Sequence, residues 1–270
     1  MGQKKNLQYL TPSFYEMLGG QNYLSALQPA LDNGILYIDK DAIEPPFVKM
    51  NNNARKPFVP WVYILKDDRF KCPLWSNIYF DLFKFQMGAP PSGCQSCWKT
   101  VVRPRTLREL FKMKDIQAQL DVHSKCGIHL SKDMFGLYQA VFYKRSLEEA
   151  LEQYSEIRKI VDDKIGEDCS VIVKRGCTKM EKIFPNTKEW AVSPRQQNIE
   201  NALDTLIEFK NTLTPQNKLI NDATMQMWIE EAYKIGDETY RNFTNGKDIG
   251  VVNVTYHNLE NSKEEVTKNG

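Results

Sequence analysis

Residues 97–177 alternate between strand-like and helix-like patterns, and this order constrains the fold more than any other feature of the chain. Apolar and β-branched residues fill four short runs, which read CWKTVVRP, KCGIHLS, GLYQAVFYKR and CSVIVKRGC. Thr106 with Glu109, and Ser146 with Glu149, have the spacing of a capping box, so a helix follows the first run and another follows the third. The order βαββαβ predicts a ferredoxin-like centre with an antiparallel sheet. Right-handed crossovers then give the strand order 4-1-3-2.

The flanking segments predict extensions around this centre rather than separate large domains. A chain of 270 residues allows one large domain or two modest ones. We expect an N-terminal α/β extension over 1–92, the metal-binding centre over 93–185, a C-terminal helical extension over 186–260 and a disordered tail over 261–270. The aromatic runs PFVPWVYIL and SNIYFDLFKFQ predict strands or buried segments in the first extension. Long helices over 194–213 and from Thr214 onward, and a late strand IGVVNVTYHNL, are expected in the second.

Cysteines of this centre are predicted to meet at one end of its sheet. Cys94 and Cys97 precede strand one, Cys126 opens strand two and Cys177 follows strand four. Strands one and two run one way and strands three and four run back, so all four thiols fall at the same end. Strand two is the far edge strand, so the Cys94–Cys97 loop must cross the sheet end or Cys126 must reach back, with His123 as the substitute ligand. Cys72 and Cys169 fit buried core residues better.

Four thiolates are the ligand set of a structural zinc ion, which is bound tetrahedrally. An iron–sulfur cluster is the alternative with the same ligands. A catalytic zinc deaminase is disfavoured because no histidine precedes Cys94, and four thiolates leave no open position for water. A thioredoxin-like redox pair is disfavoured because Cys94 and Cys97 lead into a strand and not into a helix.

No other motif in the chain indicates catalysis, so a non-enzymatic role is favoured. Nucleotide-binding glycine loops, a nucleophile elbow and a metalloprotease helix are all missing from the sequence. No run approaches the roughly 20 apolar residues of a membrane span, and the N-terminus has no apolar signal core. A cytoplasmic location and reduced thiols are therefore expected.

Basic residues cluster near the cysteines and suggest contact with nucleic acid. The net charge is only +2, so any such contact needs a local patch. Strand alternation sends several polar and aromatic side chains to the sheet face away from the helices. They are Lys99, Arg103, His129, Gln139, Tyr143 and Lys174. The candidate nucleic-acid residues are Lys99, Arg103, Arg105, Tyr143, Lys174 and Arg175. The sequence thus predicts a zinc-stabilised protein associated with nucleic acid or with regulation. The alternatives are an assembly protein that binds another protein and uses zinc only to hold its shape, and an iron–sulfur protein.

Overall fold

The computed structural model describes residues 27–39, 41–42, 44, 46–51, 60–83, 89–130, 136–209 and 216–250. Within this part of the chain, helices combine with a five-stranded antiparallel sheet and a three-stranded mixed sheet. The α+β class expected from the sequence is therefore observed. No helix in the described segments is both long and apolar enough to cross a membrane.

The large sheet has the strand order β3-β5-β6-β4-β7. Its strands are β3 (Trp61–Ile64), β4 (Trp98–Arg103), β5 (Ser124–Ile128), β6 (Tyr138–Lys144) and β7 (Ser170–Arg175). The last four correspond to the four strand-like runs of the sequence, and their neighbour order is the expected one. The additional strand β3 comes from the N-terminal segment and pairs with β5.

A glycine permits the close approach of β3 to β5. The N–H of Ile128 donates to the carbonyl of Pro60, with an N···O distance of 3.1 Å. A Cβ atom placed on Gly127 would lie only 2.0 Å from that carbonyl oxygen. Only glycine therefore fits at this position of β5.

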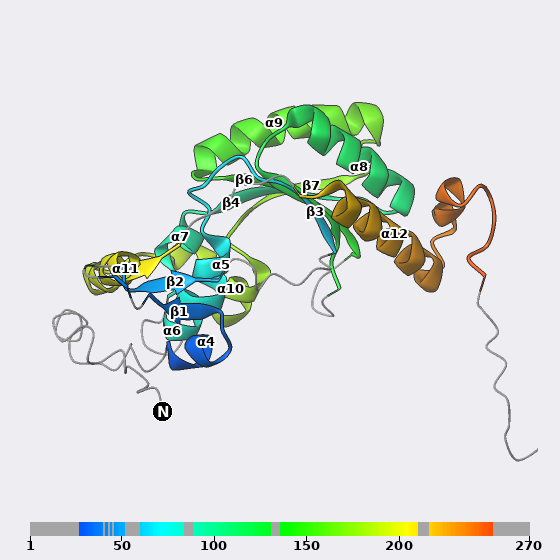
Figure 1. Cartoon of the computed structure of the whole chain (residues 1–270). Coiled ribbons are helices and arrows are strands. Elements are labelled where there is room, and N and C mark those ends of the chain that lie inside the picture. Colours follow the sequence, from blue (N-terminus) through cyan, green and yellow to red (C-terminus); the bar gives the residue numbers. More distant parts are fainter. Residues whose placement is uncertain are drawn as a thin grey trace, which may run out of the picture.

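Helices α8 (Leu107–Leu120) and α9 (Leu147–Lys164) together cover one face of the large sheet (Figure 1). Both begin at the predicted capping boxes. Thr106 Oγ1 accepts from the N–H of Glu109 at 3.3 Å, and Ser146 Oγ accepts from the N–H of Glu149 at 3.1 Å. Their inward residues form a helix-side core with the sheet, which includes Leu110, Phe142, Ile157 and Val161.

Helix α12 (Lys218–Ile235) lies against β3 and α8 (Figure 1). Trp228 on this helix is fully buried, and its indole N–H donates to the Pro60 carbonyl at 3.0 Å. Its ring also contacts Phe111 edge-on, with the centroids 5.7 Å apart. The 3₁₀ helix η4 (Glu238–Phe243) follows and packs against α8 and α12.

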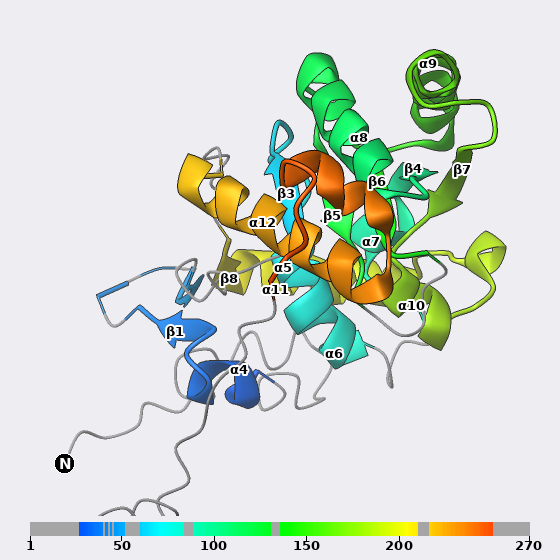
Figure 2. The same ribbon diagram turned by 90° about the vertical axis from the view of Figure 1, so that its right-hand side faces the viewer.

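A second apolar core, here called the cysteine-side core, forms from the remaining segments (Figure 2). The small sheet contributes β1 (Leu36–Ile38), β2 (Val48–Met50) and β8 (Ile207–Glu208). The helical elements of this part are α4 (Gln28–Asp32), α5 (Cys72–Leu74), the π-helical turn η2 (Trp75–Tyr79), α6 (Phe80–Phe83), α7 (Ser92–Gln95), α10 (Thr178–Ile183), the 3₁₀ helix η3 (Thr187–Glu189) and α11 (Pro194–Leu206). Tyr143 of β6 also packs against this core, which therefore reaches the large sheet.

Three segments differ from what their sequence predicted. The aromatic run after Ser76 is helical rather than extended, and it buries Ile78, Tyr79 and Phe80 in the cysteine-side core. The helix expected over 194–213 ends at Leu206, where the chain enters β8. The proposed helix start at Thr214 and most of the proposed late strand, over 251–259, lie outside the described residues.

Candidate metal centre

Cys94 and Cys97 occupy a tight turn at the entrance to β4. Cys94 lies in the short helix α7, and the N–H of Cys97 donates to the Cys94 carbonyl at 3.3 Å. Trp75 packs directly on this turn, since a Cβ atom on Gly93 would lie 2.2 Å from the indole ring. Both cysteines are buried, at 6% and 3% exposure. The pair leads into a strand, as the sequence predicted.

Antiparallel pairing of β4 with β7 brings Cys177 beside this turn. Trp98 is opposite Arg175, and the N–H of Gly176 donates to the Cys97 carbonyl at 2.7 Å. Gly176 has a left-handed backbone with φ of 69°, which turns the chain into the N-cap of α10 at Cys177. Strand direction therefore places Cys177 next to Cys97, although eighty positions separate them in the sequence.

Cys126 lies on the opposite face of the sheet from these three cysteines. Its side chain is fully buried in the helix-side core, and its thiol donates to Gln117 Oε1 at 2.9 Å. Alternation along β5 puts Cys126 on the same face as Ile128, while Lys125, which precedes Cys126, points the other way. The predicted grouping of Cys126 with Cys94, Cys97 and Cys177 is therefore not found. Cys169 is also a buried core residue, as expected.

Cys72 instead joins the three cysteines. It begins α5, packs against the cysteine-side core and is partly buried. Burial raises the pKa of its thiol to about 12, and the neighbouring Cys177 and Cys97 add to this rise. Burial likewise raises the pKa of Cys94, with further contributions from Cys177, Cys72 and Cys97. The four thiols that influence one another are thus those of Cys72, Cys94, Cys97 and Cys177.

Lys99 gives this cysteine cluster its electrostatic character. Its side chain comes from β4 and is only 4% exposed. The ammonium donates to the Gly176 carbonyl at 2.7 Å and to Cys177 Sγ at 2.8 Å. Burial acts to raise the pKa of Cys177, but the positive charge of Lys99 and its hydrogen bond outweigh this and bring the pKa below its ordinary value. Cys177 is therefore the thiol best prepared to be a thiolate.

Other polar groups of the same sheet face surround the cysteine cluster. Burial lowers the pKa of Lys125 to about 8, and its ammonium lies 3.9 Å from the ring centroid of Trp61. His123, the substitute ligand suggested by the sequence, stacks on Phe70 at 4.7 Å, and its Nδ1 accepts from the N–H of Asp67 at 3.2 Å. That nitrogen is therefore already engaged in holding the loop before α5.

The thiols of the cysteine cluster are close enough to act on one another electrostatically, but they do not form a recognisable metal site. Among the described residues, no three His, Cys, Asp or Glu side chains stand in an arrangement that could hold a metal ion as drawn. The four thiols that act on one another nevertheless come from three separate segments, at Cys72, at Cys94–Cys97 and at Cys177. Cysteine thiolates are the ligands of structural zinc, and neighbouring thiols can also form disulfides under oxidising conditions.

The six candidate nucleic-acid residues are divided between two ends of β4. Tyr143, Lys99 and Lys174 are register neighbours at the cysteine end, and Lys174 pairs with Glu181. Arg175 donates to the carbonyls of Gln95 at 2.6 Å and Thr187 at 2.7 Å.

Arg103 and Arg105 lie at the opposite end of β4. Arg105 is exposed and pairs with Glu109 at 2.6 Å and with Asp168. The Nε atom of Arg103 is buried without a hydrogen-bond partner. Internal contacts thus engage Lys99, Arg105, Lys174 and Arg175, and the structure does not gather the six residues into one patch.

The sequence contained a signal against Cys126 as a member of the cluster. Alternation in KCGIHLS puts Cys126 on the same face of the sheet as Ile128 and puts the charged Lys125 on the other face. A charged side chain avoids the helix-covered face, so Cys126 is expected to lie on that covered face.

Comparisons with family models, with curated proteins and with solved structures found no match. The functional assignment therefore rests on the chemistry of the cysteine cluster and of the surfaces beside it.

Proposed function

We propose that this chain is a non-enzymatic protein whose fold is stabilised by zinc bound to Cys72, Cys94, Cys97 and Cys177. In this proposal the strands β4 to β7 and the helices α8 and α9 form the ferredoxin-like centre. The zinc ion joins the entrance of β4, the exit of β7 and the start of α5. Its role is to hold the N-terminal segment and the cysteine-side core against the sheet.

The single observation that supports the metal most directly is the buried ammonium of Lys99 on the sulfur of Cys177. A buried charge is costly unless a charge of opposite sign lies beside it. Among the described residues no carboxylate pairs with Lys99, and its nearest acidic group is the thiol of Cys177. Zn²⁺ with four thiolates carries a net charge of −2, so such a site would provide the negative charge that Lys99 requires.

Zinc is preferred to an iron–sulfur cluster as the occupant because the proposed role is structural. Tetrahedral Zn²⁺ with four cysteines contributes directly to folding and has no redox chemistry. An iron–sulfur cluster would use the same thiolates. The visible spectrum of protein purified without oxygen separates the two, since a zinc protein is colourless and a cluster protein is brown.

The ligand set is tested by comparing two cysteine variants. Zinc per chain is measured by elemental analysis for wild type, Cys72→Ser and Cys126→Ser. We expect wild type and Cys126→Ser to hold one zinc each, and Cys72→Ser to lose it along with several kcal/mol of stability. The control Cys126→Ser removes a thiol that is more deeply buried than that of Cys72 but lies outside the proposed site, at a cost of about 1 kcal/mol. Metal-free wild type would refute the proposal, and loss of zinc in Cys126→Ser alone would restore the original ligand set.

Association with nucleic acid remains part of the proposal as a partner class, supported by the basic density around β4. The internal contacts of Lys99, Lys174 and Arg175 favour a structural role for these three residues. Fluorescence anisotropy with labelled single-stranded and double-stranded oligonucleotides across a salt series tests it, since phosphate contacts weaken steeply with salt. Absence of binding at low salt would leave the alternative of an assembly protein, for which a stable complex with a protein partner is expected.

A further inference from the structure

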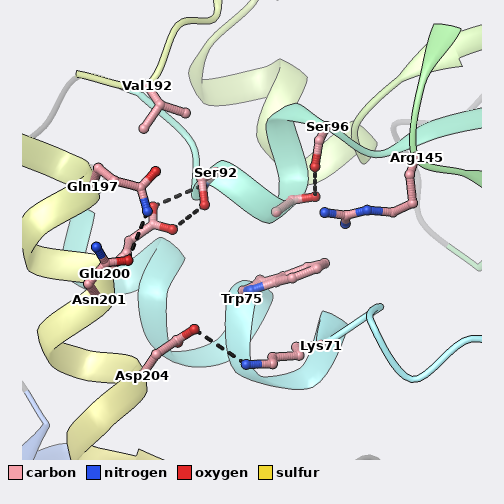
Figure 3. A pocket seen from close by; sticks show the side chains of 11 residues that line it. Lys71, Trp75, Ser92, Ser96, Arg145, Val192, Gln197, Glu200, Asn201 and Asp204 are labelled. Carbon is pink, nitrogen blue, oxygen red and sulfur yellow. Dashed lines mark hydrogen bonds and ion pairs between the residues drawn. The ribbon is translucent and has the colours of Figure 1, made fainter. Parts of the chain in front are cut away.

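A cavity of about 310 Å³ lies directly beside the turn that carries Cys94 and Cys97 (Figure 3). Ser92, Gly93 and Ser96 of that turn form one wall, and α11 forms another with Glu200 and Asp204. Its volume is at the lower end of the range of small-molecule sites, about 300–1,000 Å³. The cavity therefore suits a compact ligand rather than a large cofactor.

One side of the cavity carries an uncompensated positive charge. The side chain of Arg145 points into it above the ring of Trp75 (Figure 3), with the guanidinium carbon 5.5 Å from the ring centroid. The Nη1 atom of Arg145 is buried and has no hydrogen-bond partner. A guanidinium in this state is a ready donor for a carboxylate.

The other side carries an uncompensated negative charge. Glu200 is only 5% exposed, and its carboxylate accepts from the N–H and hydroxyl of Ser92 and from Gln196 Nε2. No cationic side chain in the described part of the chain pairs with Glu200. The second carboxylate, Asp204, is already paired with Lys71 at 3.3 Å. The two remaining charges, those of Arg145 and Glu200, belong to opposite walls and do not pair with each other.

We propose that this cavity binds a small zwitterion, of the class of free α-amino acids. The ligand's carboxylate pairs with Arg145, its ammonium lies toward Glu200, and its side chain lies between these two walls, beside Trp75. A neutral molecule would leave both protein charges without a partner of opposite charge, and a simple anion would compensate only Arg145. This site uses none of the cysteine side chains. The charge of Arg145 also reaches the cysteine cluster, because it opposes the rise that burial causes in the pKa of Cys97.

The test uses the full-length protein as purified. Binding of a panel of free L-amino acids is measured by calorimetry and by intrinsic tryptophan fluorescence, to which Trp75 contributes as one of five tryptophans. Acetate and ethylamine serve as ligands that carry only one of the two charges. We expect at least one amino acid to bind and both half-ligands to bind at least tenfold more weakly, which corresponds to about 1.4 kcal/mol. Arg145→Gln should weaken binding tenfold or more, and Arg145→Lys should restore part of it.

Matched controls separate loss of the site from loss of the fold. Arg108→Gln removes an exposed arginine of α8 outside the cavity and should leave binding unchanged. Melting temperatures of all variants are compared, and Glu200→Gln provides a second change on the opposite wall. The proposal is overturned if no amino acid binds up to about 10 mM, well above the range of a millimolar site. It is equally overturned if acetate binds as tightly as the amino acids, or if a folded Arg145→Gln binds like wild type.

Discussion

Gly176 satisfies two separate requirements between β7 and the cysteine cluster. Its backbone is left-handed, with φ of 69°, and a Cβ atom would lie 2.5 Å from the ring of Trp190. Trp190 is itself held by a hydrogen bond from its indole N–H to the Phe184 carbonyl at 3.1 Å. A side chain at position 176 would therefore strain the backbone and displace a buried ring beside Cys177.

Comparison with a second left-handed glycine isolates the contribution of this contact. Gly236 has φ of 78° and nothing within 4 Å of its Cβ position. We expect Gly236→Ala to lower the free energy of unfolding by about 1 kcal/mol from backbone strain alone. Gly176→Ala should lose about 3 kcal/mol or more, because Trp190 must also move. Urea denaturation of both variants measures the difference, and equal losses would show that Trp190 relaxes freely.

Residue-level reasoning from the sequence located three of the four cysteines that the structure groups. Strand order and direction were sufficient to bring Cys177 to Cys94 and Cys97. The fourth position needed the face of each side chain as well as the end of each strand, and Cys126 is on the wrong face. Cys72 could not be found this way, because it reaches the cluster through packing of α5 against the cysteine-side core, a tertiary contact with no local signature.

At the scale of secondary-structure elements, the carboxylate of Asp237 connects α8, β6 and η4. It accepts from the N–H of Leu107 at the start of α8 at 2.6 Å and from the hydroxyl of Tyr138 in β6 at 2.7 Å. It also caps η4 through the N–H and hydroxyl of Thr239. Burial acts to raise the pKa of Asp237, but these hydrogen bonds outweigh it and hold the pKa below its ordinary value.

This lowered pKa predicts a pH dependence of stability. A carboxyl group that is more acidic when folded stabilises the protein above its unfolded pKa of about 3.9, and the benefit is lost as pH falls through the folded value. We expect Asp237→Asn to have a lower free energy of unfolding than wild type at pH 7, and this difference to narrow below about pH 4. Denaturation at a series of pH values measures the difference. Asp222→Asn, on an exposed carboxyl of α12, should show no such gap, and a constant gap for Asp237→Asn would contradict the assignment.

Elements with a local signal were predictable from the sequence, and those formed by packing were not. The helices α8 and α9 begin at the capping residues Thr106 and Ser146, because side-chain caps act within four residues. The aromatic run around Trp75–Tyr79 has no period that separates a buried strand from a buried helix, and it forms a π-helical turn. Strand β8 has only two residues and exists because β2 pairs with it in parallel.

At the scale of the whole molecule, the large sheet separates two apolar cores. Alternating residues of β6 serve both, since Phe142 packs in the helix-side core and Tyr143 against the cysteine-side core. The helix-side core is built from α8, α9, α12 and the sheet, which are joined by backbone pairing and long helices. Apart from α11, the cysteine-side core consists of short helices and a small three-stranded sheet, so less of it is held by long regular elements. The proposed zinc would therefore contribute most to stability on that side.

Removal of the proposed zinc should therefore loosen the two cores unequally. Protein treated with a strong chelator is compared with untreated protein by amide hydrogen exchange, which reports local opening. We expect exchange to increase by about tenfold or more in α7, α10 and α11, in line with the loss of binding energy that is also folding energy. Amides of β5, β6 and α9 should keep most of their protection because the helix-side core contains none of the proposed ligands.

The Cys72→Ser variant should show the same pattern of exchange without chelator. Equal loss of protection on both sides would mean that the cores fold as one unit, and no change at all would mean that the cysteine-side core holds its shape through apolar packing alone.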